Sequence, residues 1–174
     1  MIGYITATDF KSAKGESLTK EQAIRHGLVV PGVVTDDFVI PEDEIPLGYN
    51  LNMSAIRQYL AYLVGNRQPA TNYVAAKFGV GTGTTAPTVD DTGLQAPINF
   101  YLGNAVKPID SSDFPEPFVV RFNFTLDSGE ANGYLITEMG LFAGDDTLLS
   151  RKTLTGGINK DSSFSHGLTW RIRM

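Results

Sequence analysis

Several chemistries are excluded because this chain lacks the residues that they need. It has no cysteine among its 174 residues, so disulfide bonds, cysteine zinc sites and thiol catalysis cannot occur. No stretch approaches the run of about 18 apolar residues that a membrane-spanning helix requires. The first residues, MIGYITATDFKSAKG, lack the basic start and long apolar centre of a secretory signal peptide. We therefore expect a chain that stays in the cytoplasm until it assembles.

Charge is also scarce, and its sign limits the partners. Charged residues make up 19% of the chain and the net charge is −5. An acidic protein repels the phosphate backbone, so no direct nucleic-acid partner is expected. The hydrophobic fraction of 42% is that of a globular protein. Few surface charges leave more surface for contact with other chains.

The second half of the chain has the patterning of a mainly β protein. Residues 118–126, FVVRFNFTL, alternate between apolar and polar side chains, as a half-buried strand does. Trp170 alternates with Leu168 and Ile172, which places it in the core. The pattern predicts a β-sandwich or partly open barrel with one or two short helices. The predicted strands are 73–80, 98–102, 118–126, 134–142, 147–154 and 168–174.

Residues 1–50 are expected to form an extended N-terminal arm with a short helix. Thr19 and Gln22 fit a capping box, which predicts a helix from Lys20 to about His26. Prolines 31, 41 and 46 interrupt an apolar stretch and favour an extended path. We expect this arm to lie on its own domain or on a neighbouring chain. We expect the last strand to lie at a sheet edge, covered by this arm or by a neighbouring chain.

The remaining residues, 51–174, are predicted to form one β-rich domain that includes an amphipathic helix at 52–65. Met53, Ile56, Leu60 and Leu63 recur at helical spacing and form one apolar face. The helix is expected to begin with Asn52 as its cap and to end at Gly65-Asn66. The apolar face is expected to pack into the core.

The glycine-rich segment GVGTG at residues 79–83 raises the question of nucleotide binding. A dinucleotide fingerprint needs a third glycine three residues after the second, and a helix that opens there. The segment is followed by TTAPT, and no GK[ST] sequence follows either. The glycines are therefore predicted to mark a turn or bulge at a strand end.

Other titratable residues also form no recognisable catalytic or metal-binding motif. His26 and His166 are the only imidazoles, no G-x-S-x-G elbow is present, and both are expected to be incidental surface residues. Neighbouring carboxylates could bind calcium, but none has the alternating spacing of a calcium loop, so solvated turns are expected. We predict no catalytic residue, no cofactor-binding residue and no metal ligand. These carboxylates are Asp36-Asp37, Glu42-Asp43-Glu44, Asp90-Asp91 and Asp145-Asp146.

Glu138 is the one charged residue in an unexpected position. It shares a strand face with Tyr134, Ile136 and Phe142, where an apolar side chain is expected. If that face is buried, the carboxylate needs a cation or several hydrogen-bond donors. The candidate cations are Arg121, Arg151 and Arg171. If the face is instead solvated, the aromatic residues would be covered by the N-terminal arm.

Two segments carry a resemblance to a known group of proteins. ITEMGLF at residues 136–142 is followed by the turn AGDD and by LLSRKTL at 148–154. Upstream lies FGVGTGTTAPTVDDTGLQAPI at 78–98. This arrangement resembles structural proteins of tailed-bacteriophage virions, of the tail-fibre, collar, baseplate-accessory or capsid-decoration type. The resemblance covers residues 73–174, with Met139 where family members commonly have isoleucine.

The resemblance implies a non-enzymatic virion protein without cofactors, assembled in the host cytoplasm. It would be an accessory or adaptor at the neck, tail or baseplate, a homo-oligomer in contact with other virion structural proteins. A capsid-decoration (cement) protein is an alternative. A carbohydrate-binding β-sandwich module is a further alternative, and a small hydrolase is the weakest because it lacks a motif. Aromatic side chains lining a groove would favour sugar binding, whereas a large apolar patch would favour assembly.

Overall fold

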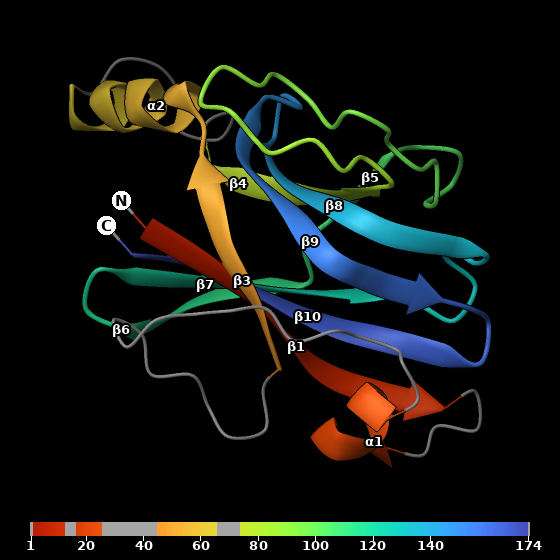
Figure 1. Cartoon of the computed structure of the whole chain (residues 1–174). Helices are drawn as coiled ribbons and strands as arrows, with labels where there is room; N and C mark the ends of the chain where they lie inside the picture. The colour runs from red at the N-terminus through yellow and green to blue at the C-terminus, as the bar shows by residue number, and fades with distance from the viewer. Residues whose placement is uncertain (1, 13–16, 26–44, 66–73, 174) are drawn as a thin grey trace.

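The computed structural model describes residues 2–12, 17–25, 45–65 and 74–173 (Figure 1). The chain is mainly β, with ten strands and two helices in these residues. In chain order the elements are β1 Ile2–Ser12, β2 Ser17–Leu18, α1 Lys20–Arg25, β3 Ile45–Asn52, α2 Ser54–Val64, β4 Ala75–Gly81, β5 Val106–Pro108, β6 Ser111–Glu116, β7 Val119–Leu126, β8 Tyr134–Ala143, β9 Leu148–Lys160 and β10 Phe164–Arg173.

The strands form two antiparallel sheets that face each other as a sandwich (Figure 1). The order along the hydrogen-bonded path is β5-β4-β8-β9-β3-β1-β10-β7-β6, and β2 pairs with β1 outside that path. β3 belongs to both sheets, because it pairs with β1 along most of its length and with β9 at Leu51 and Asn52. The predicted mainly β, sandwich-like fold with short helices is confirmed.

Aromatic and aliphatic side chains from both sheets fill the space between them. Phe78 of β4 stacks on Phe124 of β7 with ring centroids 4.3 Å apart. Trp170, Ile136 and Leu141 are each fully buried, with 0% of their surface exposed. The prediction that Trp170 lies in the core is confirmed. Alternating apolar residues on facing strands thus bury one common core, as sandwich packing requires.

The predicted hairpin of residues 134–154 is confirmed as β8 and β9. The turn between them closes where the Ala143 amide donates to the Thr147 carbonyl at 2.9 Å and the Asp146 amide donates to the Ala143 carbonyl at 3.1 Å. Asp146 has a φ of 68°, a conformation that aspartate tolerates better than most residues. The turn chemistry read from the sequence therefore fixes the register of this hairpin.

The predicted strand at 98–102 is wrong. In the described chain these residues form only isolated bridges, and the neighbouring strand is β5. The Ile98 amide donates to the Val80 carbonyl at 2.9 Å, and the Phe100 amide donates to the Asn104 carbonyl at 3.0 Å. Both side chains are nonetheless buried. The apolar alternation reflects a loop that packs on the core, which sequence alone does not distinguish from a strand.

The expectation that residues 1–50 form an arm outside the β domain is also wrong at both ends of that range. β1 pairs with β10 on one side and with β3 on the other, and β3 continues into the second sheet. The proline-rich residues 26–44 lie outside the described residues, as do His26, Asp36-Asp37 and Glu42-Asp43-Glu44. The two ends therefore contribute central strands, so the predicted boundary at residue 50 does not separate arm from domain.

The short predicted helix is confirmed as α1. Its capping box forms in both directions: the Thr19 amide donates to Gln22 Oε1 at 2.8 Å, and the Gln22 amide donates to Thr19 Oγ1 at 3.3 Å. These two bonds satisfy amides that a helix start leaves without intrahelical partners.

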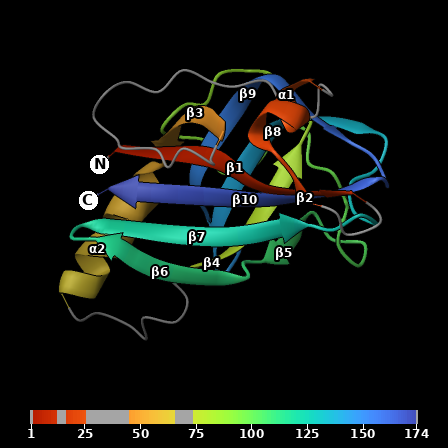
Figure 2. The same ribbon diagram turned by 90° about the horizontal axis from the view of Figure 1, so that it is seen from below.

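The last strand does not lie at a sheet edge. β10 is paired along its length with β1 and with β7 (Figure 2). The edge expectation is therefore wrong, although the cover expected from the N-terminal residues is supplied by β1. Among the described strands, the two ends of the path are β5 and β6.

Helix α2 starts one residue later than predicted. Its N-cap is Met53, without a side-chain cap bond, so the predicted cap at Asn52 is wrong. Its end at Gly65 is confirmed, where the Gly65 amide donates to the Ala61 carbonyl at 2.9 Å. Met53 and Ile56 are buried, but Leu63 is 42% exposed. The apolar face is thus only partly covered by the core. In the described parts of the chain, neither helix has the length and apolar character to cross a membrane.

Candidate functional site

The two segments that carry the resemblance meet at a buried ion pair. Glu138 of β8 and Arg151 of β9 are both fully buried, at 0% exposure. Arg151 donates from Nε and Nη2 to Glu138 Oε2, at 3.0 and 2.8 Å. Of the two interpretations of Glu138, the buried one is confirmed, with Arg151 as its cation. Arg121 instead pairs with Asp113.

The other partners of the Glu138 carboxylate are backbone amides from the loop that follows β4. Oε1 accepts from the amides of Gly83 at 3.1 Å and Ala96 at 2.7 Å, and Oε2 accepts from Gln95 at 3.1 Å. Residues 82–97, which we term the clamped loop, are therefore held at both of their ends by one side chain. Hydrogen bonds from three backbone amides, together with the charge of one guanidinium, offset the cost of burying this carboxylate.

Arg151 holds the middle of the clamped loop. Its Nη1 donates to Asp91 Oδ2 at 2.8 Å, and its Nη2 donates to the Thr85 carbonyl at 3.2 Å. Asp91 is fixed in turn by Thr88, whose amide and hydroxyl donate to it at 3.0 and 2.8 Å. One guanidinium thus links the loop to the β8–β9 hairpin, using the fork of donors that lysine lacks.

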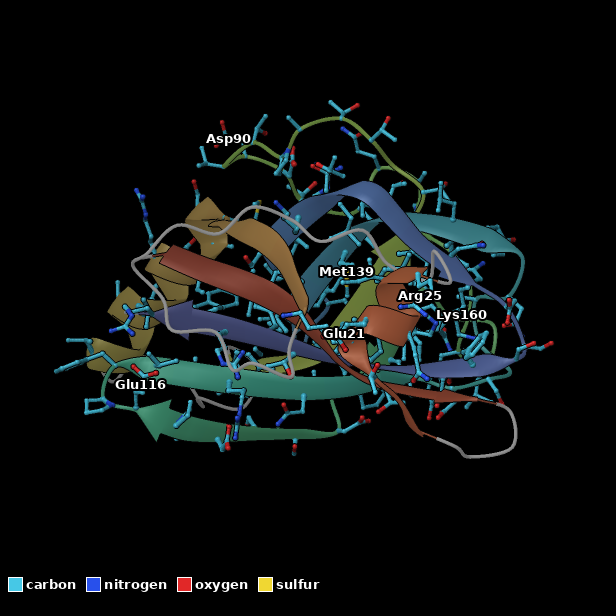
Figure 3. The ribbon with its side chains drawn as sticks, turned by 60° about the horizontal axis from the view of Figure 1, so that its bottom comes forward. Glu21, Arg25, Asp90, Glu116, Met139 and Lys160 are labelled. Atoms are coloured by element: carbon cyan, nitrogen blue, oxygen red, sulfur yellow. The ribbon has the colours of Figure 1, made fainter. Side chains whose placement is uncertain are left out.

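Asp91 is tuned to remain charged in this position. Partial burial pushes the pKa of its carboxyl upward, but the hydrogen bonds from Thr88 and the Arg151 guanidinium outweigh that effect and leave the pKa below its usual value. The expectation that Asp90-Asp91 is a solvated turn therefore holds for only one member. Asp90 is exposed on the loop, outside the sheets (Figure 3), whereas Asp91 points inward to Arg151.

The last two glycines of GVGTG, Gly81 and Gly83, are required by this carboxylate. A Cβ added to Gly83 would lie 2.5 Å from Glu138 Oε1, and one added to Gly81 would lie 2.5 Å from the same oxygen and 2.6 Å from the Ala96 carbonyl. Real Cβ atoms do not approach so closely. The interpretation as a structural feature at a strand end fits, and its cause is the close approach of a buried side chain to the backbone.

A second polar cluster surrounds two buried lysines. Lys107 of β5 donates to Asp127 and Glu130, both at 2.9 Å, and to the Thr125 carbonyl at 3.0 Å. Burial lowers the pKa of Lys107, but its hydrogen bonds to the two carboxylates outweigh burial and raise it overall. Lys160 of β9 is fully buried and donates to Asn132 Oδ1 at 2.9 Å and to the Asp161 carbonyl at 2.7 Å.

His166 belongs to the same part of the molecule and is fully buried. The expectation of a surface histidine is wrong, because β10 is an interior strand with neighbours on both sides. Burial, with the nearby positive charge of Lys160, lowers the pKa of His166 to about 4. The imidazole is therefore neutral at physiological pH.

The pair Asp145-Asp146 is used in local contacts at the hairpin turn. Asp145 accepts from the Tyr59 hydroxyl at 3.1 Å and from the Thr147 amide at 3.1 Å, and Asp146 pairs with Lys77 at 2.6 Å. Across residues 2–12, 17–25, 45–65 and 74–173, no three histidine or carboxylate groups gather as a metal ion would need. The charged side chains of this region serve to join elements.

No local pattern in the sequence indicates several of these roles. Asp91 and Arg151 are 60 residues apart, and the burial of Lys107, Lys160 and His166 depends on sheet neighbours that no short pattern specifies. The spacing of Glu138 on an apolar face was the one usable signal, because it predicts a buried carboxylate in need of a cation.

Comparisons of the chain with protein-family models, curated proteins and solved structures found no match.

Proposed function

We propose that this chain is a non-enzymatic structural protein of a tailed-phage virion, an accessory or adaptor at the neck, tail or baseplate. It assembles as a homo-oligomer in contact with other virion chains. The observation that carries the proposal is the Glu138–Arg151 cluster. It joins the two segments of the resemblance, ITEMGLF with LLSRKTL and the upstream glycine-rich loop, into one packed unit.

The chemistry of the cluster supports a structural role over a catalytic one. Both carboxylate oxygens of Glu138 are occupied by donors of the protein itself. A general base must reach a proton of its substrate, and a carboxylate with 0% exposure behind its own loop does not. The residues instead shape and stiffen a surface loop, which suits a protein whose function is contact.

The surface also favours assembly over the carbohydrate-binding alternative. Exposed apolar side chains gather beside α2 and β6, around a cavity with aromatic walls. Sugar recognition needs several polar groups beside the aromatic rings to satisfy hydroxyls. Here Ser112 and the hydroxyl of Tyr59 are the polar lining groups, and that hydroxyl already donates within the protein.

The location is tested by finding the chain in intact particles. Tailed particles from the organism that encodes it should be purified on a density gradient, analysed by mass spectrometry and imaged by electron cryomicroscopy. The chain should be present in fixed copy number, with density for the sandwich at the neck, tail or baseplate. Density on the capsid surface would favour the decoration alternative. Absence from washed particles of a host that expresses the chain would contradict the virion role.

A further inference from the structure

An apolar groove lies between α2 and the β6–β7 hairpin. Its volume is about 630 Å³. One wall is the face of α2 with Ile56, Tyr59 and Leu63, and the floor includes Leu141 and Ile172 from the two sheets. Figures 1 and 2 place α2 and the β6–β7 turn at the same end of the sandwich. The groove explains why the apolar face of α2 is only partly buried: its outer turns border open space.

The same surface carries two protruding aromatic rings. Phe114 on β6 is 80% exposed and Phe118 in the β6–β7 turn is 77% exposed, although both line the groove. Phe118 has a φ of 65°, a left-handed conformation that is costly for a bulky residue. A glycine or asparagine would make this turn with less strain. The turn instead holds a phenylalanine in that conformation and leaves its ring in water, where it gains nothing from burial.

β6 is also an edge strand, where Pro115 and a register shift between Asp113 and Glu116 limit main-chain pairing and leave contact to the side chains. Within the described residues it pairs only with β7. Edges are commonly guarded by charge, but both carboxylates of β6 are neutralised within the chain: Asp113 pairs with Arg121, and Glu116 pairs with Arg173 at 2.9 Å. The hydrogen bond from Arg121 also holds the pKa of Asp113 below its usual value, with the Arg171 charge nearby. Two copies of this edge can therefore approach with little repulsion.

We propose that the groove is the self-association surface of this protein and that its occupant is a second copy of the chain. Phe114 and Phe118 of each copy enter the groove of the other, with the two β6 edges facing each other. A surface that carries both the hollow and the projections is complementary to itself, which is the requirement for an isologous interface. The groove would be the contact surface of the homo-oligomer proposed above. This inference rests on the homo-oligomer alone and not on the proposed place in a virion.

The exposed apolar area is large enough for the centre of such a contact. At roughly 150–250 Å² for a large aromatic side chain, the exposed parts of the two rings supply about 300 Å². Val74 at 46% and Leu63 at 42% exposure also line the groove and add to the patch. A stable interface buries about 800 Å² on each partner. The patch can therefore form the apolar centre of such an interface, where anchoring residues concentrate.

The test measures the mass of the full chain by light scattering and its self-association constant by sedimentation. The expected result is an oligomer at micromolar concentration, which the double variant F114S/F118S weakens by about tenfold or more. L63K, at the groove rim, should weaken it independently of the hairpin. The matched control is L102S, which removes a leucine that is 85% exposed and does not line the groove. Circular dichroism confirms that each variant is folded.

The absence of cysteine allows a second, geometric readout. S111C introduces a single thiol on β6, to which a nitroxide spin label can be attached, and the dipolar coupling between copies reports their separation. Strong coupling at position 111, and weak coupling for L102C, is expected. A monomer at all concentrations, an oligomer unchanged by F114S/F118S and L63K, or a small apolar molecule found bound by native mass spectrometry would overturn the proposal. A self-associating chain that is missing from virions would overturn the proposed location and leave this surface intact.

Discussion

The clamped loop and the apolar groove differ in which side chains they bury: the loop buries polar groups, and the groove leaves apolar groups exposed. At the loop, a carboxylate, a guanidinium and several amides lie in the interior, and each described contact satisfies a partner. At the groove, two phenylalanines lie in water beside a hollow that could bury them. Buried polar groups with complete partners fix a shape, whereas exposed apolar groups without cover favour association. The comparison separates the part of the molecule that sets its form from the part that we propose as its contact surface with a second copy.

Removing the buried carboxylate should have the largest effect. Glu138→Ala leaves Arg151 charged and buried and leaves three amides without their acceptor, so the free energy of unfolding should fall by about 3–5 kcal/mol. Urea denaturation followed by Trp170 fluorescence measures this. The control is Asp113→Asn, which breaks the partly exposed pair with Arg121 and should cost at most about 1 kcal/mol. Equal losses of unfolding free energy in the two variants would show that the buried cluster stabilises the fold no more than the Asp113–Arg121 pair does.

Acid should destabilise the second polar cluster next. The pKa of His166 is about 4 in the folded chain, below its unfolded value of 6.5. Between these values the unfolded chain binds a proton that the folded chain does not, so stability falls as the pH decreases through this window. The free energy of unfolding should be about 2–3 kcal/mol lower at about pH 4.5 than at neutral pH.

His166→Gln is the matched variant for this window, because it removes the titration while keeping a polar side chain. Its stability should depend less on pH between about 6.5 and 4. Carboxylates with lowered pKa values, such as Asp91 and Asp113, lose their contribution to stability only as the pH falls below the ordinary aspartate pKa of 3.8, so they do not obscure the test. If the free energy of unfolding of His166→Gln depended on pH as steeply as that of the parent chain, the loss of stability in acid would come from other groups.

Gly83→Ala should have a smaller effect at the same clamp. The added methyl would lie 2.5 Å from Glu138 Oε1, so either the carboxylate or the loop has to shift. Overpacking of this kind costs about 1–3 kcal/mol. The exposed Gly129, whose added Cβ meets nothing within 4 Å, provides the control Gly129→Ala. Unfolding free energies that match for the two variants would contradict the close approach at Gly83.

The groove variant should have the smallest effect on the stability of the isolated fold. F114S/F118S removes rings that are mostly in water, so the free energy of unfolding at a concentration too low for association should change by no more than about 0.5 kcal/mol. A large loss of stability in the dilute chain would show that the rings are part of its core.

The sequence predicted the elements whose determinants are local. The alternation in residues 118–126 predicts β7. Thr19 and Gln22 predict the start of α1, and the turn formers after Phe142 predict the β8–β9 hairpin. It failed where partners are distant in the chain. β1 was placed in an arm because nothing in its residues shows that β10, more than 150 residues away, lies beside it.

The candidate site shows the same division. Glu138 stood out because its strand places it among apolar residues, and that position alone predicts a buried carboxylate with a cation nearby. Which of three arginines pairs with it depends on the register of β8 against β9, and its amide partners depend on the path of the clamped loop. Neither is encoded in a short motif, so both became visible only in three dimensions.

The central claim is that one carboxylate makes the clamped loop part of the rigid sandwich, and amide hydrogen exchange tests it most directly. The amides of Gly83, Gln95 and Ala96 donate to Glu138 and should exchange only on global unfolding, as slowly as core strand amides. In the Glu138→Gln variant these three amides should exchange faster, while the core amides of β8 and β10 should still exchange slowly. Rapid exchange at all three in the parent chain, typical of a surface loop, would contradict the account.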